Sequence, residues 1–291
     1  MKKPSLIAIV GPTASGKTEF SIKLAKKIGG EIVSADSRLV YKGFNTVCAK
    51  PTLKERCGIP HYMMDLIEPE YEYSAALYAK EARKVITEIL SRGKKPIIVG
   101  GTGLYFRLLL ENYDLPKVPP DYALREELKE YPTDKLVDIL YELDPNAIEE
   151  LESPNDRKKL IRTIEIVKNG GSALSEIRGI KNESEYEVEW FGKNFPREEL
   201  YDRINKRVDK MLENGMIEET QTLLKKHGRI PNITETIGYR EIISYLDGKL
   251  TLEDALNQLK QNTRRYAKRQ LTWFRRNDKI KWDFYPEILK K

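Results

Sequence analysis

A glycine-bounded loop follows the first apolar run of the chain. The apolar run covers residues 6–10, and residues 11–18 read Gly-Pro-Thr-Ala-Ser-Gly-Lys-Thr. This order is typical of a buried strand, a phosphate-binding loop and a helix that begins near Lys17. Successive backbone N–H groups and a helix N-terminus together form a concave site for an anion. The sequence therefore predicts that the chain binds a phosphate or diphosphate group.

The polar residues of this loop have distinct expected roles. Lys17 supplies a positive charge, and the hydroxyl of Thr18 is placed to ligate Mg²⁺, so we expect Mg²⁺ as cofactor. We assign catalytic roles to both residues. The residues of the loop expected to bind the diphosphate are Gly11, Pro12, Thr13, Ala14, Ser15, Gly16, Lys17 and Thr18.

Size and composition are those of a soluble globular protein large enough for one large α/β domain, or for a domain and an insertion. The chain has 291 residues, of which 40% are hydrophobic and 33% are charged. No apolar run is long enough to span a bilayer, and the segment before the first strand is too short for a signal peptide. Cys48 and Cys57 lack metal-ligand spacing, so we expect a cytoplasmic protein without a membrane partner. The net charge of +6 permits a nucleic-acid partner.

Strands and helices alternate along the first third of the chain. Apolar patterning predicts strands at 6–10, 31–35, 62–67 and 96–99 and helices at 17–28, 74–91 and 104–110. Such alternation predicts an α/β fold, a doubly wound parallel sheet like that of P-loop NTPases, flanked by helices. Ligands bind at the carboxyl ends of strands in such folds. We therefore expect the loop, Asp36 and the glycine-rich turn 100–103 to meet in one cleft.

The pattern becomes helical after a linker that contains Pro116, Pro119 and Pro120. The predicted helices are 121–131, 133–143 and 155–168, then 197–214, 217–227, 237–246 and 252–276 after a strand at 186–191. We divide the chain into a first core part at 1–115, a helical insertion at 116–185, and a second core part with a helical C-terminal region at 186–291.

The last predicted helix is amphipathic and strongly basic. Its apolar stripe consists of Leu256, Leu259, Tyr266, Ala267, Leu271 and Phe274. Its basic residues and those that follow are Lys260, Arg264, Arg265, Lys268, Arg269, Arg275, Arg276, Lys279 and Lys281. A solvated face is the ordinary explanation of such a run. The one-sided excess favours a track for a phosphate backbone. Trp273 and Phe274 are expected to be core anchors.

Several short motifs, in order along nearly the whole chain, resemble one family. They are the loop at 11–18, Ser-Ala-Asp-Ser at 34–37, Val-Tyr-Lys-Gly at 40–43, Ala-Lys-Pro at 49–51, Ile-Pro-His at 59–61, Gly-Gly-Thr-Gly-Leu-Tyr at 100–105, Ile-Gly-Tyr at 237–239 and Ala-Lys-Arg-Gln-Leu-Thr-Trp-Phe at 267–274. Together they are similar to the tRNA dimethylallyltransferases, also called tRNA isopentenyltransferases. The chain departs from the family pattern at Cys48, where a Thr is frequent, and at 158–162.

The resemblance implies a reaction and its partners. A dimethylallyl group would pass from dimethylallyl diphosphate to the exocyclic N6 amine of the tRNA adenosine 3′ to the anticodon. The implied partners are the diphosphate and the anticodon stem-loop of tRNA, and we expect the protein to act as a monomer. The target base would have to be extruded from its stack into the cleft.

The chemistry gives Asp36 a candidate role. An adenine amine becomes acidic once it attacks, so a nearby carboxylate is useful as a general base, and Asp36 is the candidate. Its alternatives are a cap or a residue near Mg²⁺. Thr13 and Thr102 are expected to orient the substrates, although Thr102 could instead only cap the following helix. His61 could lie near the tRNA or be structural, and His227 is expected to be structural.

Arginines complete the predicted sites. Arg203 and Arg207 lie one helical turn apart, and the resemblance suggests that they reach the diphosphate, whereas the alternative for them is ion pairing with Asp202 or Glu199. The expected tRNA-binding residues are Asp36, Ser37, Arg38, Leu39, Thr102, Arg125, Lys158, Lys159, Leu160, Ile161, Arg162, Arg264, Arg265 and Arg269.

Three other functions use part of these features. An ATP-dependent kinase of a small molecule explains the first third equally well, but leaves the basic helix without a role. A nucleic-acid-binding module would not need an intact phosphate loop. A prenyltransferase acting on free adenine nucleotides would have little use for the basic surface. We therefore favour the tRNA prenyltransferase, with the kinase as the alternative.

Overall fold

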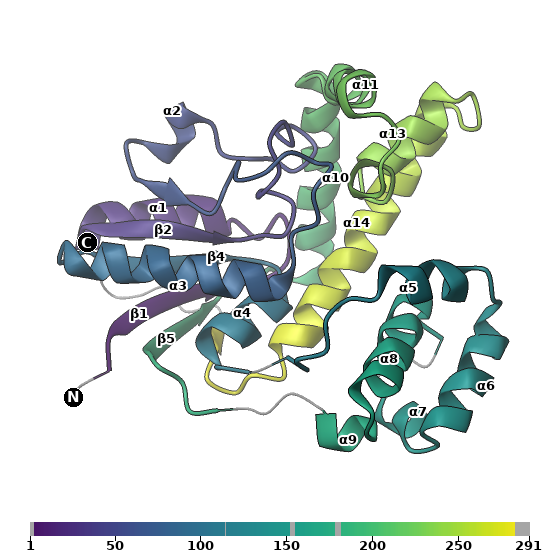
Figure 1. Ribbon diagram of the computed structural model, residues 1–291. Helices are drawn as coiled ribbons and strands as arrows, with labels where there is room; N and C mark the ends of the chain where they lie inside the picture. Colours follow the sequence, from purple (N-terminus) through teal and green to yellow (C-terminus); the bar gives the residue numbers. More distant parts are fainter. Residues whose placement is uncertain (1–2, 114, 152–154, 178–181, 283–291) are drawn as a thin grey trace. The chain divides into compact units, whose positions relative to one another are not determined.

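The computed structural model describes residues 3–113, 115–151, 155–177 and 182–282 (Figure 1). Two compact units share the chain. Unit 1 combines Met1–Glu111 with Ser184–Lys291, and unit 2 is the intervening segment Asn112–Glu183. Each unit has its own apolar cluster, so each is described by itself.

Unit 1 contains a six-stranded sheet whose paired strands are all parallel. Its order is β3-β2-β4-β1-β5-β6, which places the first strand of the chain between β4 and β5 (Figure 1). The carboxyl ends of parallel strands share one edge, so the segments that follow β1, β2, β4 and β5 meet there. The strands are β1 (Ser5–Val10), β2 (Gly30–Ala35), β3 (His61–Tyr62), β4 (Lys95–Gly100), β5 (Glu187–Gly192) and β6 (Lys281–Trp282).

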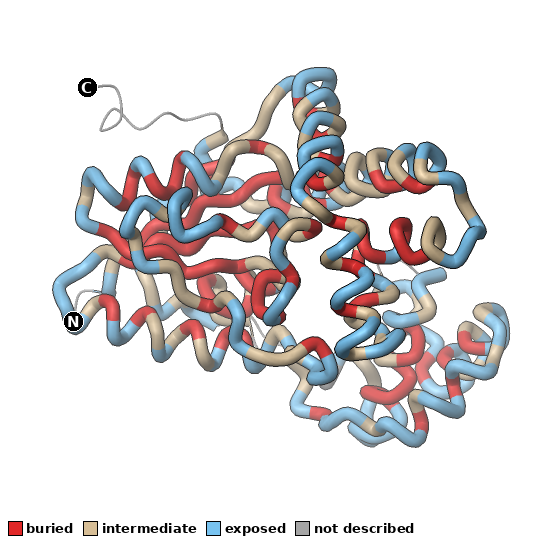
Figure 2. The backbone as a smooth tube through the Cα atoms, turned by 90° about the horizontal axis from the view of Figure 1, so that it is seen from above, coloured by how far each residue is buried: buried red, intermediate tan, exposed pale blue. Residues whose placement is uncertain are grey.

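Helices cover both faces of this sheet because β1 alternates its apolar side chains between them. Leu6 and Val10 pack with α3 (Ala75–Ser91) and α4 (Gly103–Leu110), whereas Ile9 packs with α1 (Lys17–Ile28) on the other face. The central strands are buried along most of their length (Figure 2). The predicted α/β fold with a parallel sheet is therefore confirmed.

One predicted strand is much shorter than expected. The sequence predicts a strand over 62–67, but β3 ends at Tyr62. Met63 and Asp65 have left-handed φ values of 63° and 53°, which interrupt an extended strand. The backbone of 65–67 instead bonds to the neighbouring loop, where Asp65 and Leu66 donate to Leu39 and Val40 and Ile67 forms an isolated bridge with Tyr41. The other predicted strands agree with the structure to within one or two residues.

Helices form the rest of unit 1. The helices of the C-terminal part pack around an apolar cluster that includes Phe44, Val208 and Tyr239, whereas the short helix at 53–56 buries none of its residues. The predicted start of a helix at 237 is wrong by two residues, because Gly238 adopts φ 105° and caps the helix at its N-terminus. The helices are α2 (Leu53–Arg56), α10 (Arg197–Glu213), α11 (Met216–His227), α12 (Pro231–Thr234), α13 (Tyr239–Leu246) and α14 (Leu252–Phe274). The sequence did not predict α2, α12 or β6.

The C-terminal anchors behave as predicted. Phe274 is buried, and its ring meets that of Phe106 edge-on at a centroid distance of 5.6 Å. Trp273 covers Gly103, where an added Cβ would lie 2.1 Å from the indole. The end of α14 is thus packed against α4, which follows the glycine-rich turn.

Unit 2 is a helical bundle. Leu136, Leu160 and Ile164 are fully buried in its core. The three predicted helices are present, and the structure adds two single-turn helices. The elements are α5 (Tyr122–Lys129), α6 (Thr133–Leu143), α7 (Ala147–Glu150), α8 (Arg157–Gly170) and α9 (Leu174–Ile177).

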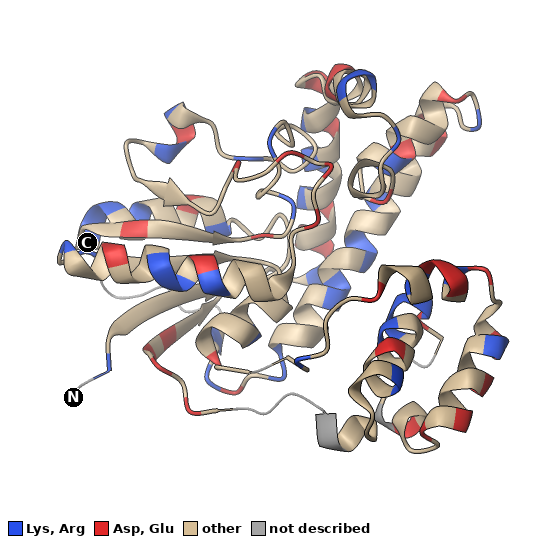
Figure 3. Cartoon of the chain, in the orientation of Figure 1, with Lys and Arg blue, Asp and Glu red and all other residues tan. Residues whose placement is uncertain are grey.

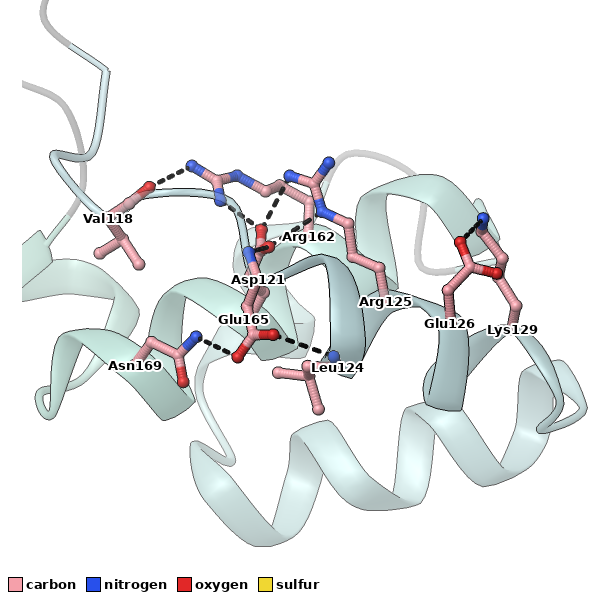
Figure 4. Close-up of polar contacts among 9 residues, drawn as sticks. All are labelled: Val118, Asp121, Leu124, Arg125, Glu126, Lys129, Arg162, Glu165 and Asn169. Carbon is pink, nitrogen blue, oxygen red and sulfur yellow. Dashed lines mark hydrogen bonds and ion pairs between the residues drawn. The ribbon is translucent and has the colours of Figure 1, made fainter. Parts of the chain in front are cut away.

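A buried carboxylate organises the start of this bundle. Glu165 has no exposed side-chain surface and accepts hydrogen bonds from Arg125 and Arg162, and from the backbone N–H of Asp121 (Figure 4). Burial alone would raise the pKa of Glu165, but these hydrogen bonds outweigh it and hold the pKa below its usual value. The cluster therefore joins α5 to α8 through a charged Glu165.

We expect Glu165→Gln to lower the free energy of unfolding by about 3 kcal/mol, because it leaves two partly buried cations without their anion. Urea denaturation of the variant against the wild type measures this. The control is Glu126→Gln, whose exposed pair with Lys129 should contribute little. Equal stability of both variants would contradict a structural role for the Glu165 cluster.

Candidate functional site

The phosphate loop leaves β1 and turns sharply into α1. A Cβ at Gly11 would lie 2.1 Å from the carbonyl oxygen of Lys193, so only glycine fits where the loop passes the end of β5. Gly16 has φ 78° at the N-cap of α1, a conformation that favours glycine. Ala14 also has a left-handed φ, of 62°. The loop is therefore held in a strained turn whose backbone precedes a helix N-terminus.

Lys17 is half-buried at the end of this loop. Its Nζ donates to the carbonyl oxygen of Pro12 at 2.6 Å. Burial and the nearby charge of Arg207 lower the pKa of Lys17 to about 7, although Asp36 opposes the shift. The fold thus places a cation where its charge is poorly compensated, as expected for a site that receives an anion.

Two turns at the carboxyl edge of the sheet hold each other. Asp36 follows β2, and its Oδ1 accepts the backbone N–H of Arg38 at 2.8 Å. Thr102 follows β4 and lies at the N-cap position of α4, yet its hydroxyl makes no capping bond there. The hydroxyl instead accepts the backbone N–H of Ser37 at 3.0 Å. Thr102 therefore orients the Asp36 turn, and capping of the helix is not the role of its side chain.

Arg203 and Arg207 project from α10 toward the phosphate loop. Arg203 Nε donates to the carbonyl oxygen of Ala14 at 3.0 Å, and its guanidinium stacks 4.2 Å from the ring centroid of Phe195. The predicted alternative, a pair with Glu199, is present only at 3.9 Å. Arg207 donates to the carbonyl oxygen of Cys48 at 3.3 Å, and burial lowers its pKa.

Several of these groups line a cavity of about 370 Å³ within unit 1, whereas Arg203 and Thr102 are not among its lining residues. Lys17, Thr18 and Arg207 lie on its walls with Asp36, so the predicted convergence of loop and strand ends is present. Its apolar lining includes Val47, Cys48, Val208, Met211, Ile237 and Leu259. The cavity can therefore hold a ligand with a charged end and an apolar part.

Two residues on α14 were not assigned to the site from the sequence. Gln270 is buried and contacts the phosphate loop, and Tyr266 lines the cavity. The signal for Gln270 was available, because it is a polar residue in the buried phase of the helix, three residues after Ala267 and four before Phe274.

The predicted tRNA-binding residues of unit 1 lie in three settings. Ser37, Arg38 and Arg269 line the cavity, whereas Leu39 is buried although it also borders it. Arg265 is exposed, and Arg264 donates to Asn205 at 2.9 Å. Basic residues recur along α14 (Figure 3). The helix thus extends a basic surface from the cavity.

In unit 2 the structure removes two residues from the predicted tRNA-binding set. Leu160 and Ile161 are buried in the core of the bundle, so their side chains are not available to a partner. Arg125 and Arg162 hold Glu165, and Lys158 and Lys159 are exposed at the start of α8. Contacts of these four basic residues with RNA remain a prediction.

The two histidines differ in their surroundings. His61 lines the cavity, with Nδ1 2.8 Å from the carbonyl oxygen of Ile59, and burial lowers its pKa. His227 packs at the end of α11 with Nδ1 2.5 Å from Glu70. The structure therefore places His61 at the site, while His227 contacts a loop carboxylate.

Comparison with known proteins assigns the chain to a family. The family model described as IPP transferase matches residues 39–277. The chain belongs to the IPP transferase family. A tRNA dimethylallyltransferase of Carboxydothermus hydrogenoformans is 45% identical, over 98% of this chain and 94% of the relative. One from Pelotomaculum thermopropionicum is 44% identical, over 97% and 91%.

Solved structures agree with this membership. The tRNA isopentenylpyrophosphate transferase of Bacillus halodurans aligns with a TM-score of 0.74 at 41% identity, covering 99% of this chain and 94% of that one. A eukaryotic dimethylallyltransferase acting on tRNA aligns with a TM-score of 0.78 at 32% identity, covering 93% of this chain and 70% of that one.

None of the helices in the described part of the chain has the length and apolar character needed to span a membrane.

The lowered pKa of Lys17 predicts that anion binding takes up a proton. Near neutral pH part of Lys17 is neutral, and a bound diphosphate raises its pKa and so protonates it. Calorimetry of inorganic pyrophosphate binding in buffers of different ionisation enthalpy should show this uptake, and Lys17→Met should reduce it. Lys23→Met, on the exposed face of α1, is the control. The same uptake in both variants would contradict the assignment.

Without a ligand, the same shift makes stability depend on pH. The folded pKa lies below the unfolded value of 10.5, so the unfolded chain binds more protons between about 7 and 10.5. The contribution of Lys17 therefore increases the free energy of unfolding as the pH rises through this window.

Proposed function

We propose that this protein transfers a dimethylallyl group from dimethylallyl diphosphate to the N6 amine of a tRNA adenosine, the one 3′ to the anticodon. The observation that carries the proposal is that one cavity is lined by the phosphate loop, by Asp36 and by the basic helix α14. The cavity can thus place the diphosphate leaving group, a general base and a surface that binds RNA around the allylic carbon and the attacking amine. The names of the relatives, tRNA dimethylallyltransferases, support it. We expect the protein to act in the cytoplasm as a monomer.

The donor half of the site is suited to a diphosphate leaving group. Departure from an allylic carbon leaves a delocalised cation, so the enzyme mainly has to stabilise the developing negative charge. Lys17, Arg203 and Arg207 surround the loop with positive charge. Thr18 and Asp36 line the cavity with oxygen donors of the kind that Mg²⁺ prefers, and Thr18 would hold it. Bound Mg²⁺ would add positive charge at the leaving oxygens.

The acceptor half depends on Asp36. The bond from the Arg38 backbone to Oδ1 fixes the rotation of the carboxylate and leaves Oδ2 for a substrate proton. As the N6 nitrogen forms its bond to the allylic carbon, Asp36 accepts the proton that nitrogen loses. Extruding the base costs a few kcal/mol, which contacts between the basic face of α14 and the RNA backbone would offset.

The deciding experiment supplies two donors in parallel. The purified protein, Mg²⁺ and unmodified tRNA are incubated with dimethylallyl diphosphate labelled in the prenyl group, or with γ-labelled ATP. Prenyl label in the tRNA, mapped to the nucleotide 3′ to the anticodon, is the expected result. Phosphate transfer from ATP without prenylation would show a kinase and overturn the proposal.

Asp36→Asn should lower turnover by about 10²-fold or more, because it removes the base yet can still accept the Arg38 N–H. The affinity for tRNA should change little, which a filter-binding titration checks. Asp202→Asn, which only loses an exposed pair with Lys206, is the control. Turnover of Asp36→Asn within about three-fold of that control would exclude general-base catalysis by Asp36.

Replacement of Arg264, Arg265 and Arg269 by Gln should weaken tRNA binding and reduce its salt dependence. Each lost phosphate contact lowers the slope of log K against log salt by about 0.7 to 0.9. Binding titrations over a range of salt concentrations measure the slope. The matched control replaces Lys23, Lys26 and Lys27 on the exposed face of α1. Equal slopes for the two triple variants would show that the basic face of α14 is an ordinary solvated surface that does not bind RNA.

A further inference from the structure

A buried amide of α14 joins two of the segments that form the cavity. Gln270 is 6% exposed. Its Oε1 accepts the backbone N–H of Thr13 in the phosphate loop at 2.8 Å. Its Nε2 donates to the carbonyl oxygen of Gly101, in the turn after β4, at 3.0 Å. Both polar ends of the side chain are therefore used on backbone groups from different elements.

The fit at Gly101 is tight. A Cβ added at Gly101 would lie 2.0 Å from Nε2 of Gln270, so the absence of a side chain at this position is what admits the amide. Only a side chain with a donor and an acceptor at the same distance from its Cα satisfies both backbone groups. Glutamate lacks the donor when ionised, and methionine has the length without either group.

The turn that Gln270 holds also carries the Asp36 segment. Thr102, next to Gly101, donates its backbone N–H to the carbonyl oxygen of Ala35 at 3.2 Å and accepts the N–H of Ser37 at 3.0 Å. The contacts thus form a continuous path from Thr13, through Gln270 and the 101–102 turn, to the residues on both sides of Asp36.

We propose that Gln270 is a positioning residue that sets the spacing between the phosphate loop and the Asp36 turn. This inference rests on the proposed function, in which the phosphate loop binds the leaving diphosphate and Asp36 accepts the proton of the attacking amine. A misplacement of about 1 Å between reacting groups can cost about 10²-fold in rate. Gln270 follows Arg269 on the same helix, so the helix that carries the basic surface also fixes the catalytic distance.

The test compares substitutions on one helix. Gln270→Met should lower kcat at saturating substrates by about 10²-fold while the KM for tRNA stays near the wild-type value. The matched control is Gln261→Met, an exposed position on α14 that should keep wild-type kcat. Thermal melting reports whether each variant is folded. A folded Gln270→Met enzyme with kcat within about three-fold of the control overturns the proposal.

Gln270→Glu keeps the test decisive if the methionine variant does not fold. The ionised carboxylate still accepts the Thr13 N–H but faces the Gly101 carbonyl, whereas the protonated form regains the donor. The ratio of its kcat to that of the wild type should therefore recover as the pH falls. A ratio near one at every pH overturns the proposal, because loss of the donor would then have no effect.

Failure of the proposed function has a different signature. A wild-type chain that transfers no prenyl group would refute the transferase first. Gln270 would then be judged by binding of inorganic pyrophosphate, which Gln270→Met should weaken and Gln261→Met should not. Equal pyrophosphate affinities of the two variants would also exclude a role of Gln270 in shaping the phosphate loop.

Discussion

The site is organised by two half-buried cations whose charges act on each other. Lys17 comes from the helix after β1 and Arg207 from α10, and burial lowers the pKa of each, while Asp36 opposes the shift in both. Burying charge without full compensation is unfavourable, so the rest of unit 1 has to supply the free energy that keeps them in place. A bound diphosphate would relieve this cost, because its negative charge would compensate both cations. The two cations would thus lower the stability of the ligand-free protein and raise its affinity for a diphosphate.

The sheet makes this arrangement possible. Its central strand β1 is buried on both faces, so the loop at its end has little freedom. The adjacent strands β4 and β5 deliver Gly101 and Lys193 to the same edge. The catalytic groups therefore stand on rigid elements, and the irregular backbone is confined to short turns that bond to one another. Such turns hold a carboxylate more closely than a long loop would.

Much of this organisation could be predicted from local sequence. The phosphate loop, the helix after it and the position of Asp36 follow from short-range patterns, and the structure agrees with them. The prediction of a strand over 62–67 was wrong because Met63 and Asp65 adopt left-handed φ values there. Neither residue type indicates this conformation from sequence as strongly as glycine does. Burial of Leu160 and Ile161 could have been read from helical spacing, which places them with Ile164 on one face of α8.

The bridge made by Gln270 could not be predicted, because it joins residues 257 positions apart on one side and 169 on the other. Sequence patterns report the phase of a helix, and the partner of a polar side chain in that phase is set by packing. The same limit applies to Arg207, whose helix face was clear while its acceptor, a loop carbonyl, was not.

Cys48 shows how the site tolerates a departure from the family pattern. Arg207 bonds the carbonyl oxygen of this residue, a group that every residue type carries. The loop conformation is held from its other side, because Glu219 of α11 accepts the backbone N–H groups of Thr46 and Val47 and the hydroxyl of Tyr239. The orientation of Arg207 therefore depends on the path of the backbone, and a side chain of similar size can replace another at position 48. A change at Glu219, which does not itself line the cavity, would disturb the arginine more than a change at Cys48, because Glu219 holds the backbone of this loop.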